Sequence, residues 1–230
     1  MTSDIESLPT SDRIVDRLCA NLDRRCKDPN IAWPYHPRVG LGATLVDCLL
    51  NSLGASSASF AKALSDGAIL VRRNATIGGK RRSKRLDLVI CRHEPGAILV
   101  AVEAKACMTA HAKAHTRLVA ELTSSLDAIL DADSRAKFFS LVAINCGTTF
   151  TSPLKLPGPN RHGADDGPAL ARALAQSLTN NVEICGTLFL PIRFDNEQSC
   201  ESAPDVVEPH LCRDSAFQQD LIEVLGLSSH

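Results

Sequence analysis

Apolar residues recur with a helical period in the first part of the chain and with a strand period from residue 68 onward. The segments 11–26 and 41–54 repeat apolar side chains every three or four positions, which predicts two amphipathic helices. The β-rich runs AILVRRNATIGG and RLDLVICR follow, and because a basic stretch separates them they predict a hairpin with a basic tip. After the turn sequence EPG, the almost continuously apolar run AILVAVEAK predicts a central strand covered on both faces.

Helical and strand patterns alternate along the rest of the chain. The longest helical pattern spans 108–133, with an apolar stripe formed by Leu118, Leu122, Leu126 and Ile129. KFFSLVAINCG and VEICGTLFLPIRF predict two further strands, and ALARALAQSLTNN and AFQQDLIEVLGL predict two further helices. Strands interleaved with helices indicate an α/β fold, and the hairpin makes its central sheet mixed rather than fully parallel.

The chain has 230 residues, which is enough for one domain or for one domain with appendages. A chain of this length can bury about 70% of the surface of its unfolded form and needs no disulfide or metal ion to fold. We expect a helical and loop extension at 1–37, a core at 38–195, and at 196–230 an acidic loop and a C-terminal helix that packs on the core. The stretch 148–168 is rich in proline, glycine and polar residues, which predicts a long loop.

Cysteine usage and the N-terminal sequence bear on the compartment. The nine cysteines are odd in number and form no C-x-x-C pair, which is typical of reduced thiols in a cytosolic protein. The N-terminal segment is acidic and has neither the basic start nor the apolar stretch of a secretory leader. No apolar run approaches the ~20 residues of a membrane span. These features predict a soluble, cytoplasmic protein without a membrane partner.

Three charged residues interrupt the apolar runs that should form the centre of the sheet. Asp87 lies within RLDLVICR, and Glu103 and Lys105 lie sixteen and eighteen residues later, where AILVAVEAK ends. If the two runs pair about the EPG turn, the carboxylates approach each other at one end of the sheet, and Glu103 and Lys105 share a face. Two buried carboxylates repel each other, and a divalent cation with oxygen ligands removes this cost. The pattern predicts an Mg2+ site beside a lysine, which suits phosphodiester hydrolysis.

The order of these features resembles the PD-(D/E)xK nuclease superfamily. An Asp lies within one strand, E-x-K closes the next apolar strand, and a helix and another strand follow. The matching residues are Asp87 in LDLVI and Glu103, Ala104 and Lys105 in LVAVEAKA. The resemblance, which covers residues 38–150, implies a restriction-endonuclease-like αβββαβ core with a mixed central sheet flanked by helices. It also implies that Asp87, Glu103 and the Ala104 carbonyl bind Mg2+, for which Mn2+ can substitute, and that Lys105 acts on the attacking water or on the developing charge.

Leu86 and Asp47 lie near this motif and bear on how well the chain matches the superfamily pattern. Leu86 stands where the superfamily motif has proline, a position that varies widely among its members. Many members add an acid from the helix before the sheet, and Asp47 is the candidate for that metal ligand here. The plain alternative for the whole group is an exposed strand end with a surface Glu–Lys pair. His111 and His115, four residues apart, could hold zinc, but the sequence offers no third ligand nearby.

The segment between Ala68 and Leu86 is basic. It contains seven cationic residues and no acid, whereas the net charge of the chain is −1, so the rest of the chain carries −8. This concentration is typical of a surface that binds a polyphosphate, although a solvated basic turn has the same composition. The helix after E-x-K adds two cations. The candidate DNA contacts are Arg72, Arg73, Lys80, Arg81, Arg82, Lys84, Arg85, Lys113 and Arg117.

These features predict a metal-dependent endodeoxyribonuclease that hydrolyses duplex DNA. The resemblance favours a type II restriction enzyme of bacterial restriction–modification defence, acting as a homodimer because two DNA strands need two active sites. Two alternatives stay open: a defence effector nuclease with little sequence preference, switched on by a second messenger, and a non-catalytic DNA-binding protein of the same fold. The intact set of Asp87, Glu103 and Lys105 argues against the last of these.

Overall fold

The computed structural model describes residues 10–27, 41–79, 83–93, 97–108, 110–150, 160–161, 163–181, 183–194, 201–202 and 214–227. The helices are α1 (Thr10–Lys27), α2 (Leu41–Ser56), α3 (Ala58–Ser65), α4 (His111–Ala132), α5 (Asp166–Thr179) and α6 (Asp214–Val224). The strands are β1 (Ile69–Gly78), β2 (Ser83–Arg92), β3 (Ile98–Cys107), β4 (Lys137–Asn145), β5 (Thr149–Phe150), β6 (Asn160–Arg161), β7 (Ile184–Arg193) and β8 (Glu201–Ser202).

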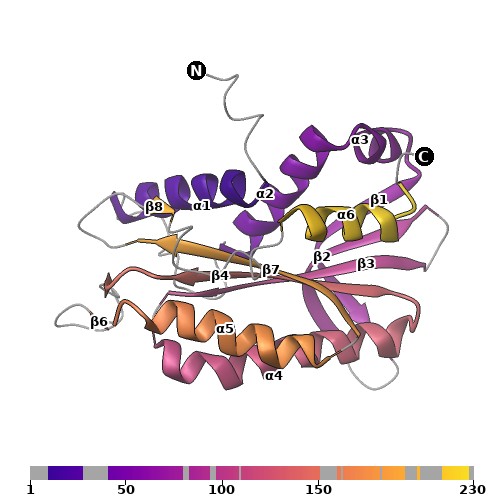
Figure 1. Cartoon of the computed structure of the whole chain (residues 1–230). Coiled ribbons are helices and arrows are strands. Elements are labelled where there is room, and N and C mark those ends of the chain that lie inside the picture. The colour runs from indigo at the N-terminus through magenta and orange to yellow at the C-terminus, as the bar shows by residue number, and fades with distance from the viewer. Residues whose placement is uncertain are drawn as a thin grey trace.

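The helices lie in two layers on opposite faces of one central sheet (Figure 1). Helices α1, α2, α3 and α6 cover one face, and α4 and α5 cover the other. The sheet contains both antiparallel and parallel strand pairs. The predicted α/β fold with a mixed central sheet flanked by helices is therefore confirmed.

The strand order in the sheet is β1-β2-β3-β4-β7-β8. The pairs β1/β2 and β2/β3 are antiparallel, whereas β3/β4 and β4/β7 are parallel, with α4 and α5 as the crossovers between the parallel strands. The elements α2, β1, β2, β3, α4 and β4 follow one another in the expected αβββαβ order, with α3 inserted after α2. The predicted loop at 148–168 contains the short pair β5/β6, and its residues 151–159 lie outside the described part of the chain.

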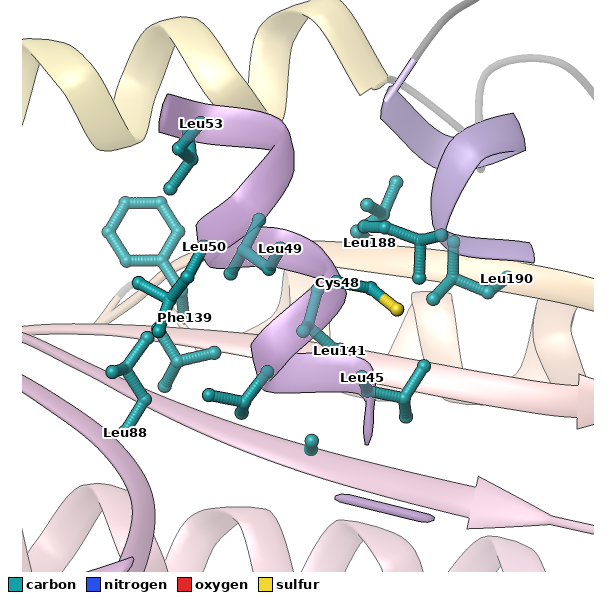
Figure 2. Close-up of a cluster of buried hydrophobic side chains, with 14 of the residues drawn as sticks. Leu45, Cys48, Leu49, Leu50, Leu53, Leu88, Phe139, Leu141, Leu188 and Leu190 are labelled. Carbon is teal, nitrogen blue, oxygen red and sulfur yellow. The ribbon is translucent and has the colours of Figure 1, made fainter. Parts of the chain in front are cut away.

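Two hydrophobic clusters hold the layers together. The α2-side cluster joins α1, α2, α3 and α6 to one sheet face and includes Leu45, Leu49, Leu88, Phe139 and Leu141. Figure 2 shows the leucines of α2 directed onto this face of the sheet. Because α2 buries five leucines, each contributing about 1.5–3 kcal/mol, its position over the sheet is firmly fixed.

The α4-side cluster covers the opposite face. It contains the predicted stripe of α4, namely Leu118, Leu122, Leu126 and Ile129, all of them buried. The strands contribute alternating residues to the two clusters, as expected for a sheet covered on both faces.

The segments outside the expected core also take part in this packing. Ile14 and Leu18 of α1 belong to the α2-side cluster, as do Phe217 and Leu221 of α6. The described parts of the extensions at 1–37 and 196–230 thus contribute to the same hydrophobic core as residues 38–195.

The predictions of reduced cysteines and of a chain without a membrane span can be compared with the described residues. Cys48, Cys91, Cys107, Cys146 and Cys185 are free thiols, whereas Cys19 is disulfide-bonded, which departs from the prediction of reduced thiols at that position. Within the described ranges, no helix combines the length and the apolar character needed to cross a membrane.

Candidate functional site

The sheet opens between β2 and β3 at the point where Asp87 and Glu103 lie. The two strands pair antiparallel, as predicted, but their last pair in this direction is Leu88 with Val102. Beyond it, β2 stays paired with β1 as far as Ser83, and β3 stays paired with β4 as far as Cys107. The two carboxylates therefore lie at a fork in the sheet, where β2 and β3 no longer pair with each other.

Beyond Leu88 the strands β2 and β3 no longer pair, and the Asp87 side chain instead binds a backbone N–H of β3. Its Oδ2 atom accepts a hydrogen bond of 2.9 Å from the backbone N–H of Ala104. The N–H and C=O groups of one strand residue point to the same side, so the Ala104 carbonyl also faces the fork. A Cβ atom built on Gly42 in α2 would lie 3.2 Å from Asp87 Oδ1 and 3.5 Å from the Ala104 carbonyl oxygen. These two oxygens thus border one small space next to α2.

Glu103 and Lys105 lie on the face of β3 that α4 covers, two residues apart. Lys105 Nζ donates a 2.5 Å hydrogen bond to Glu103 Oε1. The Glu103 side chain is only 4% exposed, and its Oε2 atom has no hydrogen-bond partner among the described residues. A buried polar atom without a partner is costly, more so when it is charged. Glu103 Oε2 is therefore an oxygen that a bound cation or a water would satisfy.

The ionisation of the three residues is strongly coupled. Burial raises the pKa of Asp87, against the opposing effects of the Ala104 N–H and the Lys105 ammonium. Burial also raises the pKa of Glu103, and the charge of Asp87 adds to this rise while Lys105 opposes it. Burial alone would lower the pKa of Lys105, but the carboxylates of Glu103, Asp87 and Glu121 together raise it. Lys105 is therefore an ammonium group at neutral pH, which makes it a hydrogen-bond donor rather than a base.

Glu121 of α4 also contacts the candidate site, a role that the sequence pattern did not assign to it. Its Oε2 atom lies 3.6 Å from Lys105 Nζ, and its Oε1 atom lies 3.4 Å from Arg117. Lys84 of β2 donates a 3.2 Å hydrogen bond to the Glu121 carbonyl. Arg117 and Glu121 are four residues apart, a spacing at which side chains on a helix surface pair, but only the packing of α4 on the sheet brings Glu121 to Lys105.

Asn74 of β1 is a second feature that the pattern did not single out. The β1/β2 pairs on either side of Asn74 place it opposite Asp87, and its φ of 49° is left-handed. This conformation is uncommon for residues other than glycine, and asparagine adopts it more readily than most. Asparagine is also depleted in strands, so an Asn within a β-rich run was the available signal.

The two halves of the β1/β2 hairpin, on either side of Asn74 and Asp87, pack against different faces of the sheet. Residues two apart on a regular strand share a face. Val71 packs with the α2-side cluster, yet Ala75 and Ile77 pack with the α4-side cluster. On β2, Leu88 belongs to the first cluster and Leu86 to the second. The far half of the hairpin thus turns toward α4, which accounts for the separation of β2 from β3 at Asp87.

The structure does not bring Asp47 to this group. Its Oδ1 atom pairs with Arg73 Nε at 2.5 Å, and both side chains are about half exposed. Asp47 lies five residues beyond Gly42, which is about 140° around the helix. Gly42, rather than the expected acid, is the α2 residue that lies against Asp87.

The candidate DNA contacts fall into three groups. Arg72, Arg85 and Lys113 are exposed. Arg73, Lys84 and Arg117 have partners within the protein, as given above. Lys80, Arg81 and Arg82 lie outside the described residues.

The two histidines of α4 have partners in different places. His111 is buried and its Nε2 atom lies 2.7 Å from the Asn145 carbonyl, whereas His115 Nε2 lies 2.9 Å from Ser177 Oγ of α5. In the part of the chain that the structure describes, no group of three or more His, Cys, Asp or Glu could hold a metal ion. The zinc alternative thus gains no support from these residues.

The fork nevertheless offers oxygen atoms suited to a hard cation. They are Asp87 Oδ1, the Ala104 carbonyl and the unpartnered Glu103 Oε2. Mg2+ and Mn2+ accept carboxylate and carbonyl oxygens, and Mg2+ keeps several waters, so two carboxylates and one carbonyl are an adequate protein contribution. The buried Glu103 Oε2 atom, which has no partner among the described residues, suits such an ion.

Neither protein-family models nor curated proteins match this chain.

Proposed function

We propose that the chain is a metal-dependent endonuclease that hydrolyses phosphodiester bonds of duplex DNA. The observation that carries the proposal is the fork between β2 and β3. There the buried Glu103 Oε2 atom has no partner among the described residues beside the Lys105 ammonium, and Asp87 Oδ1 and the Ala104 carbonyl face the first turn of α2. A surface ion pair would leave neither a buried oxygen without a partner nor two carboxylates with raised pKa.

Each residue has a distinct part in this proposal. Asp87, Glu103 and the Ala104 carbonyl hold Mg2+, or Mn2+ in its place. When bound, the ion polarises the phosphoryl oxygen and lowers the pKa of water. Lys105 donates hydrogen bonds to the phosphate or to the attacking water and offsets the negative charge that develops on phosphorus oxygens. Glu121 holds Lys105 from the other side and acts as a positioning residue.

A DNA partner is supported by the exposed cations on the hairpin and on α4. Arg85 is exposed, lies two residues from Asp87, and contributes to the electrostatic environment of that carboxylate. Its position suits a contact with a phosphate next to the one that is hydrolysed.

Replacing Arg85 with glutamine should lower the salt dependence of DNA binding. Loss of one phosphate contact lowers the slope of log K against log salt by about 0.9 for a duplex. The measurement is fluorescence anisotropy with a labelled duplex in EDTA, which keeps the DNA intact. The matched control is Arg92→Gln, because Arg92 is exposed on the same strand but at its opposite end. Equal slopes for wild type and Arg85→Gln would remove Arg85 from the DNA surface.

Incubating the purified protein with long unmethylated DNA, with Mg2+ and with EDTA, tests the proposed activity directly. We expect cleavage with Mg2+ and none with EDTA. Discrete fragments would support the finer proposal of a type II restriction enzyme, for which a homodimer is expected by sedimentation on DNA. A smear would favour an effector nuclease with little sequence preference. Absence of cleavage with Mg2+ and with Mn2+, together with retained DNA binding, would favour the non-catalytic binder.

A further inference from the structure

The first turn of α2 lies directly against the opened end of the sheet. A Cβ atom on Gly42 would lie 3.2 Å from Oδ1 and 3.4 Å from Cγ of Asp87, and 3.5 Å from the Ala104 carbonyl oxygen. These are the oxygens that remain after Asp87 Oδ2 has bound the Ala104 N–H. A side chain at position 42 would therefore occupy the space in front of both.

The helix cannot withdraw to make room for a larger residue. Leu41, Leu45, Val46 and Leu49 are buried on either side of Gly42 along the same helix, in the α2-side cluster. A close-packed interior transmits such a strain to its neighbours. The atoms that would give way are those of the Asp87 carboxylate, which is held on its other side by the Ala104 N–H.

The space matters because of the way in which small divalent cations bind. Mg2+ requires near-octahedral oxygen ligands and keeps several of its waters, so a site needs room for the ion and for its water ligands. A methyl group beside Asp87 Oδ1 and the Ala104 carbonyl would take the place of one of these waters and could not supply its oxygen.

We propose that Gly42 keeps the cation-binding oxygens of Asp87 and Ala104 accessible, so that the first turn of α2 forms a wall of the cation site. The helix before the sheet thus contributes a gap rather than an acid, and Asp47 is free to pair with Arg73. Gly42 is a positioning residue that acts through Asp87. This inference rests on the proposed function, because that function places the cation at the fork.

The test compares two glycine-to-alanine variants in the same helix. Gly42→Ala adds a methyl group at the site, whereas Gly54→Ala adds one near the other end of α2, where a Cβ atom would have nothing within 4 Å. Mn2+ binding is measured by calorimetry and by electron paramagnetic resonance of the free ion, without DNA. We expect the Kd of Gly42→Ala to rise by about tenfold or more, as for other residues that orient metal ligands, and that of Gly54→Ala to stay within twofold. Because alanine is the better helix former, its gain in helix stability should offset the small displacement of the Asp87 carboxylate, and neither urea midpoint should fall.

The outcomes separate this inference from the proposed function. If wild type binds Mn2+ and Gly42→Ala binds it equally well, the role of Gly42 is overturned while the nuclease proposal stands. If the urea midpoint of metal-free Gly42→Ala drops well below that of Gly54→Ala, the role is structural and the inference fails. If wild type does not bind Mn2+, or Asp87→Asn binds it as tightly as wild type, the cation site itself is wrong and both proposals fall.

Discussion

Asp87→Asn is expected to lower Mg2+-dependent DNA cleavage by about 10³-fold, since loss of a metal ligand forfeits several kcal/mol of transition-state stabilisation and each 1.36 kcal/mol is a factor of ten. Asparagine keeps the shape of the side chain and an oxygen that can accept the Ala104 N–H hydrogen bond. The variant should therefore fold normally and still bind DNA in EDTA. Initial rates on a plasmid measure the effect, and Asp220→Asn, at an exposed position of α6, is the control.

The same substitution should stabilise the metal-free protein at neutral pH. Burial raises the pKa of Asp87 above its unfolded value, so the folded state holds this proton more tightly than the unfolded state. The resulting stability is present below a pH of about 4, the unfolded pKa of Asp, and is lost as the pH rises through the folded pKa. The wild type should thus become less stable over this range in EDTA, and Asp87→Asn should reduce that dependence. A variant that retained cleavage within tenfold of wild type would remove Asp87 from the site.

Lys105→Met is expected to cause the largest loss of stability of any single change at the site. It leaves Glu103, whose side chain is 4% exposed, without the cation that binds its Oε1 atom. Removing one partner of a buried ion pair costs about 3–5 kcal/mol, and we expect about 3 kcal/mol here because the Lys105 side chain is 22% exposed and partly screened. Urea unfolding in EDTA at pH 8 measures this free energy.

Two comparisons identify the cause of that loss. The loss should become smaller as the pH falls, because burial raises the pKa of Glu103 and removal of the Lys105 ammonium raises it further, so that the side chain takes up a proton more readily. The double variant Glu103→Gln/Lys105→Met should recover most of the stability, since it also removes the buried charge of Glu103. Lys113→Met, at an exposed position of α4, should change stability by less than about 0.5 kcal/mol. Equal losses for the single and the double variant would mean that the packing of the lysine stem, rather than its charge, is what stabilises the fold.

These expectations share a physical basis. The group at the fork places two carboxylates and a lysine where a central sheet would be more stable with apolar residues. Functional sites are where such local conflicts persist, because catalysis or binding needs charges that folding disfavours. A gain in stability together with a loss of cation binding is therefore the combined result that distinguishes a functional site from a structural ion pair.

The sequence by itself determined most of the elements and the central residues of the candidate site. Helical and strand periods differ, so local spacing was sufficient to find α4, with Leu118 and Leu122 on its buried stripe, and the hairpin of β1 and β2. Because only a short EPG sequence separates the two runs, antiparallel pairing was the simple connection to expect between β2 and β3. Asp87, Glu103 and Lys105 stood out because charges within apolar runs break the pattern that burial imposes.

The tertiary structure decided which side chains meet. Asp47 is the acid on the expected helix, yet the rotation of α2, set by its buried leucines, directs Asp47 to Arg73 and brings Gly42 to Asp87. Glu121 reaches Lys105 only because α4 crosses the sheet at that position. Such meetings depend on how helices rotate and pack over the sheet, which is a property of the whole core. Local periodicity gives the face that each helix buries, whereas contact between residues far apart in sequence depends on the packing of all layers together.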